Sequence, residues 1–259
     1  MFLSRHGQTV WHAENRYAGV SDIDLTPTGR EQARRLAAWC RQHRPTAVVS
    51  SPVRRAVETA APSARVLGVE PVVLDDLREV NFGIAEGRTL RELEHLDPGA
   101  VHRFRSDPVR HHFAGGEPSA QAAVRAERAL RWVARRYAGA TVLVVAHNTL
   151  IRLALCQLLG LEISRYRTLF PRLDNGTLTE VSLSSDGEGH AALHSLNVPL
   201  AGGHAVTPNV GSADGHGTTL NHSGDLRAPE SELPGLRAAT PVNTHSGSTP
   251  HLEVPRRQE

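Results

Sequence analysis

The chain has 259 residues, 39% of them hydrophobic and only 4% aromatic, which predicts one large domain with a segment left outside its core. The formal net charge is only +2, which offers no bulk attraction for nucleic acid or membrane. All 29 basic residues are arginine, and the absence of lysine excludes lysine-dependent chemistry. Two cysteines and the lack of a long apolar run exclude a disulfide scaffold, a cysteine-rich metal site and a transmembrane span.

Strands and helices alternate in the first half of the chain. Residues 1–4 predict a short opening strand, and because Arg5 follows at once there is no room for a signal peptide, so the cytoplasm is the expected compartment. The capping-box pattern that begins at Thr28 predicts a helix to about His43. Residues 47–50 predict a buried strand, and Pro52 suits the first turn of a helix over 51–67. Residues 71–74 predict a third strand.

The second half continues the same alternation. A short helix is expected over 89–96, a loop-rich insertion over 97–117 and an amphipathic helix over 119–137. Residues 141–146 are a continuous apolar run typical of a buried strand, and Asn148 is expected to cap the helix that follows, to about Leu159. Two closing strands are predicted near 177–183 and 190–196. This order predicts an α/β fold with a mostly parallel sheet.

The chain changes character after residue 197. Residues 201–259 contain no aromatic residue, are rich in Gly, Pro, Ser and Thr, and show no apolar periodicity. Such a composition buries too little apolar surface to offset the entropy of ordering. We therefore expect a catalytic domain over 1–197 and a disordered tail over 198–259.

Polar side chains follow the predicted strands at the edge of the sheet where ligands bind in parallel α/β folds. Arg5 and His6 follow the first strand, Arg55 lies one turn beyond the second, Glu79 follows the third, and His147 follows the strand over 141–146. Arginine forks bind phosphate oxygens, imidazole is a nucleophile toward phosphorus, and a carboxylic acid can protonate a leaving alkoxide. No cluster has metal-ligand spacing, so the set predicts phosphoryl transfer without a metal or other cofactor.

Four blocks in this order resemble the histidine phosphatase superfamily, in the branch that includes cofactor-dependent phosphoglycerate mutase. The first block opens with Arg5-His6-Gly7-Gln8-Thr9 and the second is Ser51-Pro52-Val53-Arg54-Arg55-Ala56. The third is Leu77-Arg78-Glu79 with Phe82-Gly83, and the fourth is Val144-Val145-Ala146-His147-Asn148. The resemblance covers residues 1 to about 196 and implies a three-layer αβα sandwich of the phosphoglycerate mutase type.

The resemblance also implies a role for each matching residue. His6 matches the nucleophile that becomes phosphohistidine, Glu79 matches the proton donor, and His147 matches the second histidine at the phosphoryl oxygens. Arg5 and Arg55 match the phosphate-binding arginines, Arg55 rather than Arg54 because it directly precedes Ala56, and Asn15 matches a residue near the phosphate. Two positions depart from the family pattern, with Asn81 where Asp is frequent and Asn148 where Gly is usual.

Three functions fit this pattern. A phosphatase acting on a small phosphomonoester is favoured, because the mutases carry a longer insertion with a lysine-bearing motif and this chain has no lysine. A cofactor-dependent phosphoglycerate mutase is the second reading, and a non-catalytic phospholigand-binding module is the third. The insertion carries Arg103, Arg105 and Arg110 with His111 and His112, which suits an anionic or polyhydroxylated leaving group of sugar, cyclitol or glycerate type, although a solvated charged loop explains these residues equally well.

Overall fold

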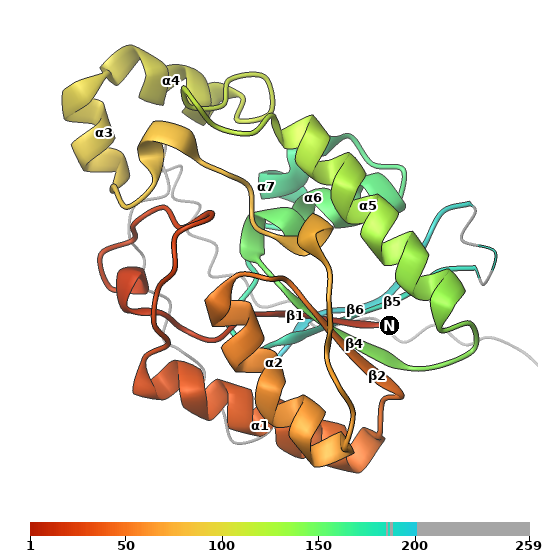
Figure 1. Ribbon diagram of the computed structural model, residues 1–259. Helices are drawn as coiled ribbons and strands as arrows, with labels where there is room; N and C mark the ends of the chain where they lie inside the picture. The colour runs from red at the N-terminus through yellow and green to blue at the C-terminus, as the bar shows by residue number, and fades with distance from the viewer. Residues whose placement is uncertain (185, 187–188, 201–259) are drawn as a thin grey trace, which may run out of the picture. The chain divides into compact units, whose positions relative to one another are not determined.

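A single mixed sheet organises the part of the chain that this computed structural model describes, residues 1–184, 186 and 189–200. Its strand order is β3-β2-β4-β1-β5-β6 (Figure 1). The parallel strands are β1 (Phe2–Arg5), β2 (Ala47–Ser50), β3 (Val72–Val73) and β4 (Val142–Ala146). The closing strands β5 (Leu178–Ser182) and β6 (Ala192–Val198) are antiparallel. The expected mostly parallel α/β sheet is thus confirmed.

Helices cover both faces of the sheet and make three layers (Figure 1). Side chains alternate along a strand, so Leu143 and Val145 of β4 face one layer while Val144 and Ala146 face the other. The first layer is α1 (Pro27–His43) and α2 (Arg54–Leu67), and the second contains α5 (Ser119–Arg136) and α6 (Asn148–Leu158). Because β4 is covered on both sides, it is apolar throughout, as its sequence predicted.

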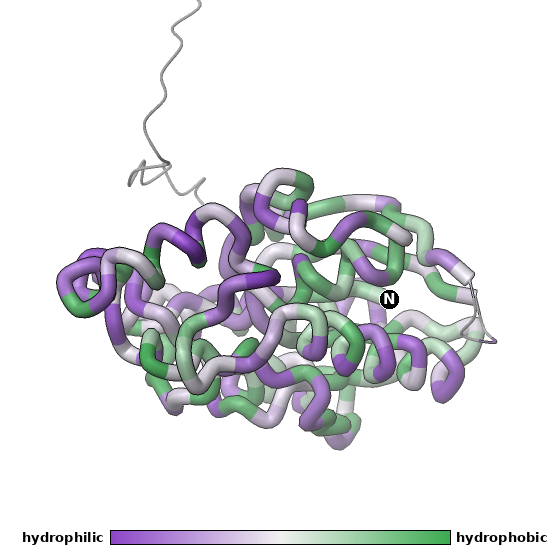
Figure 2. The backbone as a smooth tube through the Cα atoms, turned by 90° about the horizontal axis from the view of Figure 1, so that it is seen from above, coloured by the Kyte–Doolittle hydropathy of each residue, from purple (hydrophilic) through white to green (hydrophobic). Residues whose placement is uncertain are grey.

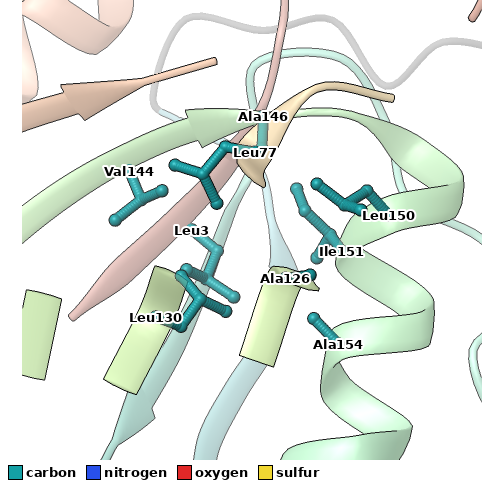
Figure 3. A pocket seen from close by; sticks show the side chains of 9 residues that line it. All are labelled: Leu3, Leu77, Ala126, Leu130, Val144, Ala146, Leu150, Ile151 and Ala154. Atoms are coloured by element: carbon teal, nitrogen blue, oxygen red, sulfur yellow. The ribbon is translucent and has the colours of Figure 1, made fainter. Parts of the chain in front are cut away.

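The outer helices are amphipathic, and Figure 2 shows hydrophobic and hydrophilic residues alternating along their length. Their apolar stripes pack on the sheet, and a small gap there is lined by nine apolar side chains of β1, β4, α5, α6 and the segment before Glu79 (Figure 3). Leu3, Val144 and Ile151 are among them. A wholly apolar lining offers nothing to bind a phosphate group, so this gap belongs to the core.

The insertion is more ordered than its Pro and Gly content predicted. The expectation of a loop-rich segment over 97–117 is wrong for its first half, because α4 (Pro98–Ser106) forms there after α3 (Leu90–Leu96). The side chain of Asp97 accepts a hydrogen bond from the Ala100 N–H and starts α4, and Pro98 occupies the first helical position, where it is tolerated. Val101 and Phe104 then pack against Phe113 in a separate small apolar cluster.

Three helix starts differ from the sequence expectation. The N-cap of α1 is Thr26, whose hydroxyl accepts from the Gly29 N–H, rather than Thr28. Helix α2 begins at Arg54, three residues beyond Ser51. Helix α6 has His147 at its N-cap position with Asn148 as its first residue.

Shorter elements complete the fold. The 3-10 helices are η1 (Val10–His12), η2 (Asp75–Leu77), η3 (Gly83–Ala85) and η4 (Ile163–Arg165), and α7 (Tyr166–Leu169) follows η4. Of the predicted tail, residues 198–200 continue from β6, and 201–259 lie outside the described residues. The division into a domain over 1–197 and a tail stays a prediction.

Candidate active site

Three neighbouring parallel strands deliver polar side chains to one edge of the sheet. After β1 the His6 N–H bonds to the Ala146 carbonyl at 3.0 Å, and after β2 the Ser51 N–H bonds to the Val145 carbonyl at 3.0 Å. The ring centroids of His6 and His147 are 5.2 Å apart as a result. The strand order β2-β4-β1 therefore juxtaposes residues that are up to 141 positions apart in the sequence.

The imidazole of His6 is buried and its proton position follows from its partners. Nδ1 lies 2.8 Å from the Gly7 carbonyl, which can only accept, so Nδ1 carries the proton. Nε2 is then a lone pair, and it accepts from Arg55 Nε at 3.1 Å. Burial, followed by the charges of Arg55 and His147, holds the pKa of His6 well below its usual range. His6 is thus a neutral imidazole whose unprotonated Nε2 is the nucleophilic nitrogen.

The turn after His6 is held against α1 and α2. The Gly7 N–H donates to the Thr59 hydroxyl at 2.9 Å, and that hydroxyl donates to the Arg55 carbonyl at 2.7 Å. A Cβ on Gly7 would lie 2.5 Å from the Gly29 carbonyl oxygen, so only glycine allows α1 to approach this closely. The packing of α1 thereby sets where His6 sits.

Arg55 is fully buried, whereas its neighbour Arg54 is exposed. Its Nη atoms donate to the carbonyls of Ser21, Ala18 and Gly19 at 3.0, 2.9 and 2.8 Å. The same loop is held from its other side by the Glu86 carboxylate, which accepts from the Gly19 N–H and the Ser21 hydroxyl. Arg54 instead pairs with Asp24 and Glu58. The preference for Arg55 over Arg54 as a site residue matches this geometry.

Arg5 reaches the same edge through partners that the sequence did not reveal. Its Nη1 donates to the Leu173 carbonyl at 2.7 Å, and its Nη2 lies 2.6 Å from His12 Nε2. Asn175 Nδ2 donates to the His6 carbonyl and lies 3.2 Å from the same His12 nitrogen. Burial lowers the pKa of Arg5 to about 10, which leaves it charged at neutral pH. Its Nε is buried and has no partner among the described residues. A buried unpaired guanidinium donor suits an anion.

His147, between β4 and α6, and Glu79, in the segment after η2, complete the cluster. His147 Nε2 lies 2.7 Å from the Ser51 hydroxyl, and its Nδ1 is buried without a partner in the described part of the chain. Burial holds the pKa of His147 well below its usual range. The Glu79 carboxylate accepts from the N–H groups of Val80, Thr149 and Leu150 at 2.9, 3.0 and 2.9 Å, which places it on the first turn of α6.

Two opposing effects act on Glu79. Burial raises the pKa of its carboxyl group, while the three backbone N–H groups and the Arg55 charge act in the other direction. The net rise makes the protonated acid more accessible near neutral pH than for an exposed glutamate. The segment that carries Glu79 is held by Arg125, which donates to the carbonyls of Asp76 and Arg78 at 2.8 and 2.6 Å and pairs with Glu117 at 2.6 Å.

Other predicted residues are not part of this cluster. Asn15 lies on an exposed turn with φ of 58°, and its side chain makes no hydrogen bond within the described residues. The structure therefore brings together His6, Arg5, Arg55, Glu79 and His147 but not Asn15. Asn81 Oδ1 accepts from the Gly83 N–H at 2.8 Å and stabilises a turn. Asn148 Oδ1 is buried and has no described partner.

Sequence reasoning missed His12, Thr59 and Asn175. Their signal was available only in part, since His12 and Asn175 come from loops without periodicity and Thr59 is one of many small residues in α2. Across the described residues no group of three or more His, Cys, Asp or Glu side chains could hold a metal ion. None of the described helices meets the length and hydropathy that crossing a membrane requires.

Comparisons with known proteins identify the family of the chain. Residues 1–197 match the model of the histidine phosphatase superfamily, branch 1. Phosphoserine phosphatase 1 of Hydrogenobacter thermophilus is 31% identical, over 64% of this chain and 79% of that protein. A bifunctional protein of Mycobacterium tuberculosis is 38% identical over 60% of this chain, which spans only 43% of that relative's length.

A solved structure has the same fold. The mycobacterial glucosyl-3-phosphoglycerate phosphatase in complex with VO3 superposes with a TM-score of 0.70 at 28% identity, over 77% of this chain and 99% of that one. The chain is therefore a phosphatase enzyme of the histidine phosphatase superfamily, branch 1.

Proposed function

We propose that the chain hydrolyses the phosphate ester of a small polyhydroxylated metabolite, of sugar, cyclitol or glycerate type, through a phosphohistidine on His6. One observation carries this proposal: His6 is a neutral imidazole whose unprotonated Nε2 faces the buried Arg55, and Arg55 forms no ion pair with a described carboxylate. A neutral imidazole needs no base before it attacks phosphorus.

The first half-reaction forms a bond between His6 Nε2 and phosphorus and breaks the bond from phosphorus to the ester oxygen. Arg5 Nε and His147 Nδ1 are buried and have no partner among the described residues, and they would bind the phosphoryl oxygens. The departing alkoxide takes the proton of Glu79. The raised pKa of the Glu79 carboxyl group favours the acid form that this step requires.

The second half-reaction consumes water. A water oxygen attacks phosphorus, the bond to His6 Nε2 breaks, and the water proton goes to the Glu79 carboxylate, which restores the acid. The products are the alcohol and inorganic phosphate. A mutase would instead return the phosphoryl group to a second hydroxyl, so release of inorganic phosphate separates the two activities.

The proposed substrate class rests on the names of the relatives and on a site whose donors suit the phosphoryl group of a phosphomonoester. The relatives are named for phosphoserine and for glucosyl-3-phosphoglycerate, both small phosphorylated metabolites. We extend this class to the present chain, and we place the enzyme in the cytoplasm as its sequence predicted. The basic residues of the insertion contribute little to the argument, because Arg103, Arg105 and Arg110 are exposed.

Trapping the intermediate tests the mechanism. Wild type is mixed with a labelled phosphomonoester and quenched in base, because phosphohistidine is lost in acid. The quenched protein should carry a base-stable, acid-labile phosphoryl group. His6→Ala should carry none and lose turnover, whereas His95→Ala, which changes an exposed histidine on α3, should behave as wild type. Label on a serine or aspartate, or normal turnover by His6→Ala, would show that the mechanism is wrong, and ligand binding without turnover by wild type would favour a binding module.

A further inference from the structure

A second group of cations lies beside the catalytic cluster, around the ring of Tyr166. The guanidinium carbon of Arg152 is 5.1 Å from the centroid of that ring, and that of Arg167 is 5.6 Å from it. Two positive charges therefore share one buried aromatic side chain. Like charges placed together cost free energy unless an anion joins them.

Arg152 is the more informative of the two. It is 9% exposed, its Nε has no hydrogen-bond partner among the described residues, and its Nη2 reaches only the Arg167 carbonyl at 3.5 Å. It forms no ion pair with a described carboxylate. Burial lowers the pKa of Arg152, and the Arg167 charge acts in the same direction.

A second buried arginine shows what full compensation looks like. Arg125 is 6% exposed and pairs with Glu117 through both Nε and Nη2, at 2.6 and 2.7 Å. Its remaining donors meet backbone carbonyls. Nothing comparable surrounds Arg152. Since an uncompensated buried guanidinium is costly, its retention needs a reason other than stability.

The position of Arg152 relative to the catalytic cluster supplies that reason. Helix α6 starts at His147, its first turn holds the Glu79 carboxylate, and Arg152 lies one turn further along. The charge of Arg152 lowers the pKa of Arg5, and the charge of Glu79 raises the pKa of Arg152, so Arg152 interacts electrostatically with residues of this edge.

Arg167 connects the same cluster to the insertion. Its guanidinium lies 4.7 Å from the Phe104 ring centroid of α4, and its Nε donates to the Tyr166 hydroxyl at 3.0 Å. Phe104 in turn contacts Tyr17, with centroids 5.9 Å apart, and Tyr17 directly precedes the Ala18 carbonyl that Arg55 holds. The second cation group thus adjoins the loop of the catalytic site.

We propose that Arg152 and Arg167 form a subsite for a second anionic group of the substrate, so that the enzyme prefers phosphomonoesters that also carry a carboxylate or a second phosphate. This inference rests on the proposed hydrolysis and narrows its substrate class. A guanidinium can donate two parallel hydrogen bonds to either anion, and a buried charge-assisted pair discriminates strongly against a neutral analogue.

Matched substrate pairs test the preference in the wild-type enzyme. Glycerate 3-phosphate and glycerol 3-phosphate differ by a carboxylate against a hydroxymethyl group, and 1,3-propanediol bisphosphate and its monophosphate differ by the second phosphate. We expect kcat/KM to favour the anionic member of at least one pair by about 10- to 100-fold, the range expected for charge-assisted hydrogen bonds. The pair that shows the preference identifies the anion. Equal kcat/KM within both pairs would overturn the inference.

Variants locate the preference. A neutral substrate does not use the guanidinium, so Arg152→Met should lower kcat/KM for the anionic substrate alone and reduce the ratio of the two kcat/KM values to about 1. Arg152→Lys should restore part of that ratio. Arg167→Met, at a half-buried position, is measured in the same way, and Arg165→Met changes an exposed arginine of the same segment as the control.

The neutral substrate reports on folding in each variant. An equal loss of kcat/KM on both members of a pair would mean that Arg152 is structural. The inference would then rest on Arg167→Met, and an unchanged ratio of kcat/KM values in that variant would refute it. Phosphohistidine formation separates the two proposals. If wild type forms no phosphohistidine, the proposed function fails; if phosphohistidine forms without any preference for the anionic substrate, only this inference fails.

Discussion

The edge of the sheet and the insertion over 97–117 both carry arginines, but these arginines differ in burial and in their partners. At the edge, Arg5 and Arg55 are buried or half-buried and form no ion pair with a described carboxylate. In the insertion, Arg105 pairs with Glu94 at 3.0 Å and Arg110 with Asp107 at 3.5 Å, and both arginines are exposed. Burial without a carboxylate, rather than the number of basic residues, marks a place built for an anion.

The same contrast applies to carboxylates. Glu79 is buried and its carboxylate accepts from the N–H groups of the first turn of α6, whereas Glu94 is an exposed partner of Arg105. An exposed ion pair contributes little to stability, and a buried carboxyl group with a raised pKa is a candidate acid. Variants at matched positions can therefore break or sharpen the comparison.

Glu79→Gln should have the largest effect within the comparison. The amide keeps the shape but donates no acidic proton, so hydrolysis of an alkyl phosphate should slow by about 10²–10⁴-fold, while the burst with p-nitrophenyl phosphate, whose leaving group is a weak base, should be spared. Glu94→Gln should leave both rates unchanged. Burst and steady-state kinetics distinguish phosphorylation of the enzyme from its hydrolysis. Equal slowing of the burst for both leaving groups would exclude Glu79 as the acid.

The pH profile of the alkyl phosphate reaction provides a second measurement on Glu79. Because the pKa of Glu79 is raised, the acid form persists to higher pH than for an ordinary glutamate, and kcat/KM should fall as pH rises through that pKa. The lowered pKa of His6 keeps the nucleophile neutral well below its usual titration, so the acidic limb should lie at low pH. Glu79→Gln should lose the basic limb. A wild-type profile without that limb would contradict the assignment.

Arg55→Met should be the next largest effect. Loss of one positioned donor at developing charge typically costs about 10²–10³-fold in kcat, and here it also releases the loop that carries Ala18, Gly19 and Ser21. Arg54→Met, one residue away and exposed, should change kcat by less than about 2-fold. Thermal unfolding of both variants controls for the loop. Similar losses at the two positions would remove the distinction between them.

Neutralising the insertion should have a small effect. Arg105→Gln combined with Arg110→Gln removes two exposed charges that already have carboxylate partners, so kcat/KM should change by less than about 3-fold and only at low salt. Steady-state kinetics at two ionic strengths checks this. A loss that persists at high salt would mean that the insertion binds substrate directly.

Chelation should have no effect. The cationic donors Arg5 and Arg55, together with the neutral imidazole of His147, stabilise the charge of the transferring phosphoryl group, and no metal takes part in the proposed steps. Turnover after dialysis against EDTA should equal that of the untreated enzyme. Loss of activity that Mg²⁺ restores would refute this prediction.

Much of the fold could be predicted from the sequence because its signals are local. Residues 141–146 read as a buried strand from their apolar run alone, and the amphipathic pattern of residues 119–137 predicted α5. The errors fell where a local signal was ambiguous. Pro98 and Gly99 suggested a loop, yet the Asp97 cap and the contact of Phe104 with Phe113 made α4. Tertiary packing outweighed a weak local preference there.

The candidate site divides in the same way. His6, Arg55 and His147 could be predicted because each stands at or just beyond the end of a recognisable strand. Asn15 was expected near the phosphate from its place in the first block, but it occupies an exposed turn in the left-handed region, and His12 contacts Arg5 instead. The path of a loop without periodicity follows from what it packs against, so its side chains could not be placed in advance.

The sequence by itself determined the alternation of strands and helices and the chemical types of the catalytic residues, because periodicity and residue chemistry are properties of short segments. Only the tertiary structure decided the environment of those residues. It put a lone pair on His6 Nε2, brought three N–H groups to the Glu79 carboxylate, and left Arg152 without an ion pair among the described residues. Burial and hydrogen bonding depend on groups that are distant in the sequence, and these set the pKa values and the unmet charges on which function rests.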